Sequence, residues 1–335
     1  QPRFAYNLAS AQPDWSLATW PDEPHVLINQ VLAVSFAPGS ARVQFDAQLA
    51  TTGYEFQYRV LAPAELLVER VSVREEAVER AARWSRDENG AVVIFLNGPA
   101  AEKQQLSLVG RLPAPLNGRL ALPQLRVEGT EMRSCEIQLF RDSSVLVEVV
   151  KSAGLVDVEL PIVGGEKAEL GRLVKWFTVA DCERQTEAEL TISPNRPEIA
   201  VAPTIRLHHD QGAWRADVDC RIVVRRGVAD EFRLRVPPQW SGPYRVTPNV
   251  SLATFDSPED RRRELILRPR LAVAGEYRLQ ISSPLTPVDG ESVGIPHIQM
   301  LDAQVGRTIC VLPATLQGQA ISWDTRGLEP VGLSP

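Results

Sequence analysis

The residues that could bind a metal ion are few in this chain. It contains four histidines, and His208, His209 and Asp210 form its one local cluster of metal-ligand types. Neighbouring side chains in an extended strand point to opposite faces, so both histidines could contact one ion only across a bulge. We therefore interpret the cluster as a solvated strand end before the turn at Gly212, and we predict no metal site.

Two carboxylates, Asp217 and Asp219, are two positions apart and therefore lie on the same face of one predicted strand. A glycosidase needs two carboxylates across a cleft, one of them with a pKa raised by burial. Here, however, both alternate with Arg215 and Arg221 on the strand phase opposite the apolar residues. This pattern is typical of a solvated cross-strand charge ladder rather than of a catalytic pair.

Motifs for nucleophilic, phosphate and calcium chemistry are absent from the sequence. It contains no Gly-x-Ser-x-Gly elbow, no phosphate-binding glycine loop and no EF-hand pattern. We therefore predict no catalytic residue and no cofactor. An enzyme whose site is assembled from distant loops stays open as an alternative, because spacing along the chain does not test it.

Aromatic side chains offer one candidate binding surface. Trp240 and Tyr244 lie in the connection 237–244, which is rich in Pro and Gly. In such a connection a ring can be held out as a stacking platform for a sugar or a partner chain. The corresponding connection earlier in the chain, 61–65, has no aromatic residue. The alternative is that Trp240 folds back over the edge of a β-sandwich as a plug.

The four cysteines, Cys135, Cys182, Cys220 and Cys310, show no Cys/His spacing of the kind that metals need. Cys135 and Cys220 fall on the apolar phase of alternating segments, which predicts small buried thiols. A disulfide between Cys182 and Cys220 stays open, because nothing in the sequence decides it.

Composition and charge narrow the class of protein. A length of 335 residues favours two domains, and a hydrophobic content of 44% is typical of globular proteins. The net charge of −6 argues against a nucleic-acid partner. No apolar run approaches the ~20 residues that cross a bilayer, so we expect no transmembrane segment in this chain.

Period-two alternation of apolar and polar residues dominates the chain. It is clear at 43–49, 56–60, 214–222 and 232–236, and it indicates half-buried antiparallel strands separated by Pro/Gly turns. One stretch, 73–84, has the composition of a short helix, but a hairpin arm fits its place between two strands equally well. We predict an all-β chain.

The second half of the chain repeats the first at a fixed spacing. Phe4 aligns with Phe177 and Gly39 with Gly212, both 173 residues apart (177 − 4 and 212 − 39). The order of the Pro and Gly residues and the alternation of apolar residues repeat at the same spacing. We predict two tandem antiparallel β-sandwich units related by internal duplication, residues 1–175 and 176–335, with a joint near 163–171.

Both ends of the chain look cut. It begins at Gln1 without Met, and at this spacing Pro335 matches only residue 162 of the first unit (335 − 173). We therefore expect the chain to be part of a longer polypeptide.

The segment from Val31 to Leu112 resembles two kinds of known β-sandwich. Its order of a long meander, a valine-rich pair, a tryptophan, a turn and a Val-Ile-Phe-Leu strand is similar to the saddle-shaped N-terminal sandwich of gluzincin aminopeptidases. It also resembles the immunoglobulin-like and jelly-roll modules of large bacterial envelope proteins. The His-Glu-x-x-His helix that marks those aminopeptidases as enzymes is absent, so the resemblance implies a fold and no activity.

These observations predict a non-catalytic structural or adhesive segment of a larger extracytoplasmic bacterial protein, either periplasmic or at the cell surface. Duplicated modules serve spacing or repeated weak contact, whereas catalysis needs one unrepeated constellation. The partner that we expect is a protein or a glycan. The competing hypothesis is a carbohydrate-binding or substrate-docking accessory region of a secreted enzyme, with Trp240 and Tyr244 as ligand-binding residues.

Overall fold

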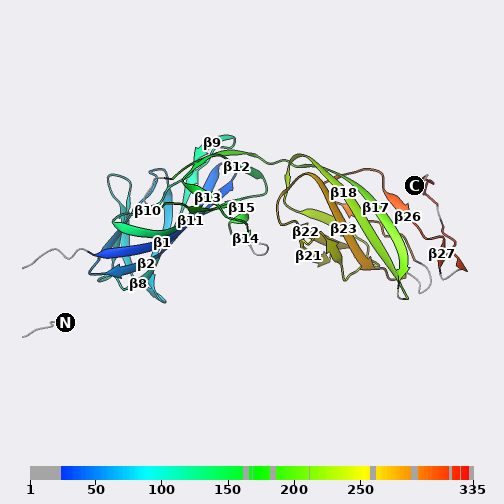
Figure 1. The fold of residues 1–335 in the computed structure, drawn as a ribbon, viewed down its shortest axis with the longest axis horizontal. Helices are drawn as coiled ribbons and strands as arrows, with labels where there is room; N and C mark the ends of the chain where they lie inside the picture. The colour runs from blue at the N-terminus through cyan, green and yellow to red at the C-terminus, as the bar shows by residue number, and fades with distance from the viewer. Residues whose placement is uncertain are drawn as a thin grey trace, which may run out of the picture.

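The computed structural model describes residues 24–160, 166–167, 169–181, 186–210, 212–256, 262–287, 293–316, 319–324 and 326–331. Every regular element within these residues is a β-strand, which confirms the predicted all-β class. The strands form two bodies that lie one after the other along the longest axis of the molecule (Figure 1). We refer to them as the first and the second unit.

The first unit is built on a large sheet, sheet A, with the strand order β13-β15-β11-β1-β2-β8-β4-β5 and with β14 paired to β15. Its strands are β1 (His25–Ala37), β2 (Ser40–Thr52), β4 (Leu67–Glu75), β5 (Val78–Glu79), β8 (Lys103–Pro113), β11 (Thr130–Arg141), β13 (Leu155–Asp157), β14 (Glu166–Lys167) and β15 (Gly171–Val179). The hairpin of β1 and β2 closes at Gly39, whose φ is 77°. Glycine adopts this conformation without steric cost, so the turn favours glycine.

One pair in sheet A departs from the predicted antiparallel arrangement. β1 and β11 are parallel, with Leu32 opposite Ile137. β11 follows β8 through a connection that contains β9 and β10, so it enters the sheet beside β1 in the same direction. Apolar and polar residues alternate in the same way along parallel and antiparallel strands. The sequence pattern therefore does not distinguish this parallel pair from an antiparallel one.

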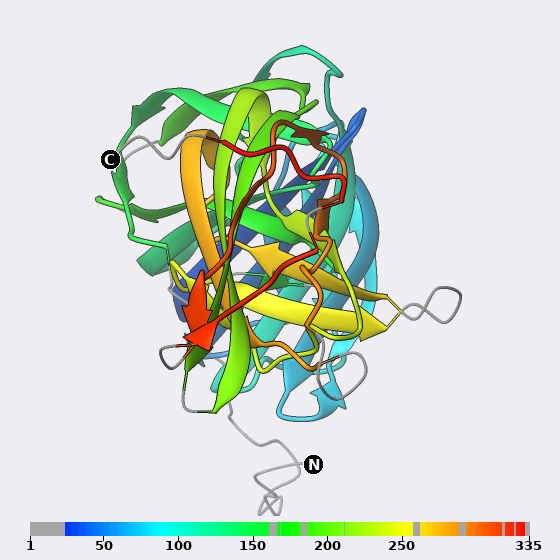
Figure 2. The ribbon, with the colours of Figure 1, turned by 90° about the vertical axis from the view of Figure 1, so that its right-hand side faces the viewer.

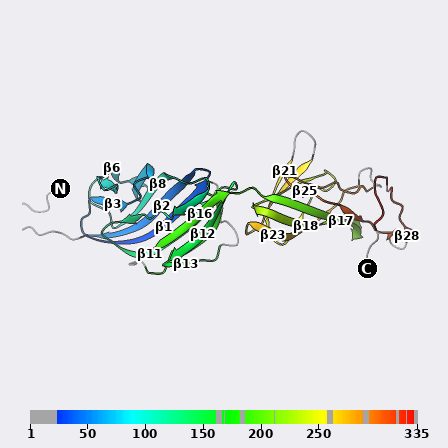
Figure 3. The same cartoon turned by 90° about the horizontal axis from the view of Figure 1, so that it is seen from above.

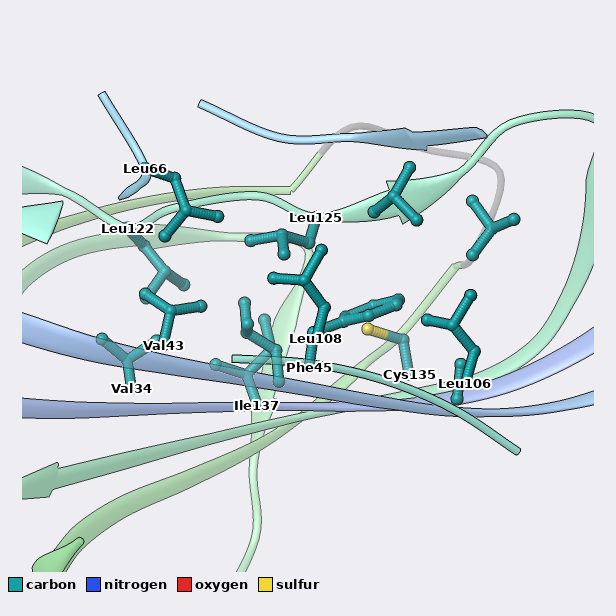
Figure 4. Close-up of a cluster of buried hydrophobic side chains, with 14 of the residues drawn as sticks. Val34, Val43, Phe45, Leu66, Leu106, Leu108, Leu122, Leu125, Cys135 and Ile137 are labelled. Atoms are coloured by element: carbon teal, nitrogen blue, oxygen red, sulfur yellow. The ribbon is translucent and has the colours of Figure 1, made fainter. Parts of the chain in front are cut away.

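Two smaller sheets complete the first unit. Sheet B has the order β10-β3-β7-β6 and sheet C the order β12-β16-β9. Their strands are β3 (Gln57–Leu61), β6 (Ala81–Arg86), β7 (Val92–Leu96), β9 (Gly118–Ala121), β10 (Arg126–Val127), β12 (Val145–Ala153) and β16 (Glu187–Pro194). Inward residues of all three sheets share one hydrophobic core. Figure 4 shows part of it, with Leu66, Leu122 and Leu125 facing Val34 and Ile137.

The first core extends past the predicted boundary at residue 175. β15 pairs with β11, and β16 pairs with β12 and β9, while Phe177 and Leu190 belong to the first core. The second core begins at Val201. The cores therefore divide between β16 and β17, where the chain passes from one body to the other (Figure 3). Of the predicted joint, residues 163–165 and 168 lie outside the described residues.

The second unit has a similar plan with fewer strands. Sheet D has the order β20-β23-β18-β17-β25, with β26 also paired to β17; sheet E has the order β21-β22-β19-β24, and β27 pairs with β28. The strands are β17 (Glu198–Asp210), β18 (Ala213–Ala229), β19 (Phe232–Val236), β20 (Arg245–Thr247), β21 (Ser251–Asp256), β22 (Arg263–Arg268), β23 (Val273–Pro284), β24 (Gln299–Met300), β25 (Gln304–Val305), β26 (Ile309–Val311), β27 (Thr315–Leu316) and β28 (Gln319–Ala320). Figure 2 shows the yellow strands of sheet E running across the green and orange strands of sheet D.

The central strands of sheets A and D have the same order, β11-β1-β2-β8 in the first unit and β25/β26-β17-β18-β23 in the second. Moving the bounds of β1 by 173 residues gives those of β17 (25 + 173 = 198 and 37 + 173 = 210). The cross-strand pairs Leu32–Ile137 and Ala47–Leu106 of the first unit have Ile205–Cys310 and Cys220–Leu279 as counterparts in the second. Both units thus contain an antiparallel hairpin flanked by one parallel and one antiparallel neighbour.

The segment 73–84 forms strands and turns rather than a helix. β4 continues to Glu75, and β6 begins at Ala81. The carboxylate of Glu79 accepts the backbone N–H groups of Val73 and Ala81 at 2.8 and 3.1 Å. This side chain thereby stabilises the turn with bonds that compete with helix formation, so the hairpin alternative is correct.

Candidate functional site

The two units meet at a polar groove of about 890 Å³. The charged residues of its wall are Arg141, Asp142, Arg172, Asp230, Glu231, Arg233, Arg268 and Asp302. Four arginines thus face four carboxylates, and the wall has no excess of either charge. The groove lies between the end of β11 and the turn that joins β18 to β19.

Asp230, in the β18–β19 turn, connects the two units. Its Oδ1 accepts a hydrogen bond from Arg141 Nη2 at 2.6 Å and lies 3.5 Å from Arg172 Nε. The side chains of Arg141 and Asp230 are only 2% and 13% exposed. Removing one member of such a buried pair leaves the other charge buried without its partner. We therefore expect the loss of either side chain to destabilise this contact between the units.

Arg172, near the start of β15, extends the joint to the backbone of the second unit. Its guanidinium donates to the carbonyl oxygens of Asp230, Pro269 and Arg270 at 2.7, 2.5 and 2.9 Å. Arg270 in turn donates to Glu159 Oε1 at 3.0 Å. Because the planar guanidinium has several donors in fixed directions, these bonds define the orientation of the two units as well as their contact.

Asn195, directly after β16, closes the other side of the joint. Its Nδ2 donates to the carbonyl oxygens of Ser143 and Val228 at 2.7 and 3.0 Å, and its Oδ1 accepts the N–H of Val228 at 3.0 Å. Gly227 lies against it with a φ of 66°, and a Cβ there would be 2.6 Å from Asn195 Oδ1. Both the backbone conformation and the available space therefore require glycine.

The carboxyl groups of the groove are held in the ionised form. Burial raises the pKa of Glu231, but hydrogen bonds from Arg233 and Arg268 outweigh burial and hold this pKa below its usual value. Hydrogen bonds from Ser144 likewise lower the pKa of Asp142. A general acid near neutral pH needs the opposite shift. The arrangement is thus suited to fixing two bodies and unsuited to proton transfer by these two carboxyls.

Trp240 lies inside the second core with none of its surface exposed. Its Nε1 donates to the carbonyl oxygen of Ser283 at 3.2 Å, and the ring of Tyr244 packs edge-on against it with 5.3 Å between the ring centroids. A ring without an exposed face cannot stack on a sugar unless it leaves the core. This geometry favours the plug alternative for Trp240, while Tyr244 is half-buried beside it.

The two neighbouring histidines have different surroundings. His208 Nδ1 lies 3.5 Å from Asp217 Oδ2, whereas His209 packs against the ring of Trp214 with 5.4 Å between centroids. Across the part of the chain that the structure describes, no three His, Cys, Asp or Glu residues come together as a metal site, and no helix could span a membrane.

The predicted charge ladder occupies the exposed face of sheet D. Asp219 forms a bidentate ion pair with Arg278, and the hydrogen bonds from Arg278 lower the pKa of Asp219. Arg221 pairs with Glu276 at 3.1 Å on the same two strands. Asp219 thus pairs with Arg278 and Asp217 lies beside His208, so the two carboxylates have separate partners, which agrees with the ladder interpretation.

Cys135 and Cys220 are buried, as their apolar phase predicts. Burial raises the pKa of Cys220 to about 12, so its reactive thiolate is scarcely populated at neutral pH. Cys310 is partly buried, and burial raises its pKa as well. Cys220 is a free thiol in this structure. Cys182, the other residue of the disulfide that the sequence left open, lies outside the described residues.

The residues of the joint have no signature in the local sequence. Arg141 and Asp230 are 89 positions apart and stand among 36 basic and 42 acidic residues, so no local spacing marks them. A second residue that was missed, Gln30, does carry a signal, because it interrupts an apolar phase that runs from Val26 to Phe36.

The fold and the joint define an all-β protein of two sandwich-like units with a fixed polar connection. No family model matches the chain, and no curated protein matches it either. Among solved structures, native yeast LTA4 hydrolase is similar, with a TM-score of 0.31 and 11% identity over 51% of this chain and 29% of that chain. A similarity of this size indicates nothing about the activity of this chain.

Proposed function

We propose that the chain is a non-catalytic structural or adhesive segment of a larger extracytoplasmic bacterial protein. The observation that carries the proposal is the joint, where Arg141 and Arg172 bond to Asp230 in the β18–β19 turn and Asn195 bonds to the end of β18. Two bodies held in a row form a spacer of defined length, and repeated units multiply weak contacts with a partner.

We infer that the two units are copies of one ancestral unit. The constant spacing of β1 and β17 and the equivalent strand order of sheets A and D support this inference. Independent origins would have to reproduce a parallel pair in the same register, with Leu32 opposite Ile137 in the first unit and Ile205 opposite Cys310 at the equivalent positions of the second. Duplication of a whole unit is typical of scaffolds and uncommon for a single catalytic site.

The extracytoplasmic location and the protein or glycan partner are parts of this proposal. The location is implied by the resemblance to envelope modules, and the buried, unreactive thiol of Cys220 is compatible with an oxidising compartment. Fractionation of cells that carry the complete gene tests it. Recovery of the protein in the cytoplasm would contradict the location.

Small-angle X-ray scattering of an Asp230→Ala variant tests the joint. The variant leaves Arg141 and Arg172 without their carboxylate, so we expect variable angles between the units and a broader distribution of interatomic distances. The matched control is Asp219→Ala, which removes an ion pair within the second unit. Identical scattering from Asp230→Ala and the wild type would contradict a joint that depends on these contacts.

A further inference from the structure

Gln30 places a polar side chain on the core face of β1. The residues on this face are Val26, Ile28, Gln30, Leu32, Val34 and Phe36, and all are buried. Gln30 is 4% exposed, and its Nε2 donates to the carbonyl oxygen of Leu125 at 3.3 Å and lies 3.2 Å from Cys135 Sγ. Its Oε1 has no hydrogen-bond partner among the described residues. A buried acceptor without a partner costs free energy.

The orientation of this amide follows from its neighbours. The carbonyl oxygen of Leu125 can only accept a hydrogen bond, so the Nε2 end of Gln30 must face it. Exchanging the two ends would place two oxygens 3.3 Å apart. The unsatisfied atom is therefore an acceptor, and what it lacks is a donor.

Gln30 lines a pocket of about 340 Å³ in the first unit. The wall is mostly apolar, with Leu32, Leu122, Leu125, Met132 and Ile137, and Arg126 is the charged residue among its described members. Figure 4 shows Leu122 and Leu125 in the layer that faces Ile137, on the core side of sheet A. An apolar cavity of this size with few polar groups is typical of a small-molecule site.

We propose that this pocket binds a small uncharged molecule with an apolar body and one hydroxyl or N–H donor, which bonds to Gln30 Oε1. The apolar wall disfavours a charged ligand, and the unsatisfied acceptor selects one that carries a donor. The second unit has no equivalent, because Pro203 and Thr308 occupy the positions of Gln30 and Cys135 (30 + 173 and 135 + 173). This site goes beyond the spacer function and belongs to the first unit alone.

The two methionines of the chain provide the readout. Met132 lines the pocket, whereas Met300 lies in the second core. The full chain, labelled with 13C at the methionine methyl groups, is titrated with p-cresol and, separately, with p-xylene. These probes have nearly the same shape, but only p-cresol carries an O–H donor. We expect a saturable shift of the Met132 methyl signal and no shift of the Met300 signal.

The variant Gln30→Leu removes the acceptor while keeping a buried side chain of similar size. We expect the ratio of the p-xylene Kd to the p-cresol Kd to fall about tenfold relative to the wild type. Comparing ratios cancels the different hydrophobicity of the two probes. The matched control is Gln104→Leu, because Gln104 is also buried in the first unit but accepts a hydrogen bond from Tyr58 at 2.7 Å. It should keep the wild-type ratio.

Three results would overturn the proposal. They are no shift of Met132 with either probe, equal shifts of Met132 and Met300, and the same Kd ratio in the wild type and Gln30→Leu. If Gln30→Leu does not fold, a measurement on the wild-type protein still tests the site. The bound p-cresol ring must then show a nuclear Overhauser effect to the Met132 methyl group, and its absence rejects the site.

Discussion

The two units share a β framework but differ at the edge where the first strand of each meets its parallel partner. In the first unit this partner, β11, is a continuous strand of 12 residues bordered by β15. In the second unit it is split into β25 and β26, of 2 and 3 residues. The difference shows that a common hairpin core can support either a wide or a narrow sheet, depending on residues at the edge.

Pro203 lies where the partner of β17 is split into β25 and β26. Counting by alternation from the turn of the β17–β18 hairpin, the backbone nitrogen of Pro203 faces the parallel partner. Proline has no N–H to donate, so the ladder is interrupted between Val201, where β25 pairs, and Thr204, where β26 pairs. Gln30 at the matching position of β1 keeps its N–H and pairs with Cys135, and β11 is one strand there, although its register with β1 shifts between Ile28 and Asn29.

The largest expected effect concerns the residue that plugs each core. Leu66 and Trp240 are both buried, and each donates its N–H to a proline carbonyl three residues earlier. Trp240→Ala should lower the unfolding free energy of the second unit by about 3–5 kcal/mol. Leu66→Ala should destabilise the first unit somewhat less, because fewer buried atoms are removed.

Denaturant titration, followed with probes in each unit, measures both variants. Each substitution should shift the transition of its own unit. A loss below about 1 kcal/mol for Trp240→Ala would mean that the ring is not a core residue, and it would restore the stacking-platform hypothesis.

Glycines of the second unit offer a test of the joint with a matched control. Gly227 and Gly212 both have positive φ angles, 66° and 80°, but only Gly227 lies against Asn195. Gly227→Ala should cost about 2–3 kcal/mol, from backbone strain and the clash together, and Gly212→Ala about 1 kcal/mol from strain alone. Thermal unfolding of both variants measures the difference. Equal losses would show that the contact with Asn195 does not constrain the joint.

Local sequence patterns predicted the strands well because alternation and turn chemistry are properties of neighbouring residues. The segment 43–49 lies in β2, and Gly39 has the positive φ that its hairpin turn needs. The spacing of 173 residues even locates β17 from β1. Gln30 was also visible in principle, since its position in an otherwise apolar phase is a local feature.

Long-range pairing could not be predicted in this way. The choice of β11 as a parallel neighbour of β1 depends on where a distant segment returns to the sheet. The pairing of β15 and β16 is also long-range. β15 crosses the predicted boundary at residue 175 and β16 follows it, yet both strands complete the first core. The ion pair of Arg141 and Asp230 exists only because two separate bodies meet, and neither residue has a local signature.

Restoring a donor at residue 203 would sharpen the comparison of the two edges. Pro203→Val supplies an N–H towards the parallel partner, and we expect slower hydrogen exchange at Arg307 and Thr308, between β25 and β26. The unfolding free energy should change by less than about 1 kcal/mol, because the new bond is offset by the greater flexibility of the unfolded chain without proline. Exchange mass spectrometry measures the protection. Unchanged exchange at both residues would show that proline is not what divides the strand.

The smallest expected effect is at the exposed charge ladder, where Asp219 and its first-unit counterpart Asp46 (46 + 173) differ in their partners. Asp219 pairs with Arg278, whose side chain is 70% exposed, whereas Asp46 accepts a hydrogen bond from Gln44 at 2.7 Å. Because Arg278 lowers the pKa of Asp219, the carboxylate stabilises the folded state above the pKa of the unfolded chain, and this contribution disappears as the pH falls through the folded-state value.

Solvent screening keeps that contribution small, so Asp219→Asn should lower the Tm by only about 1 °C at neutral pH. The difference from the wild type should shrink in high salt and vanish at acidic pH. Scanning calorimetry across pH and salt measures this. A loss at Asp219 as large as that expected at Gly227 would mean that the ladder, and not the core and the joint, holds the second unit together.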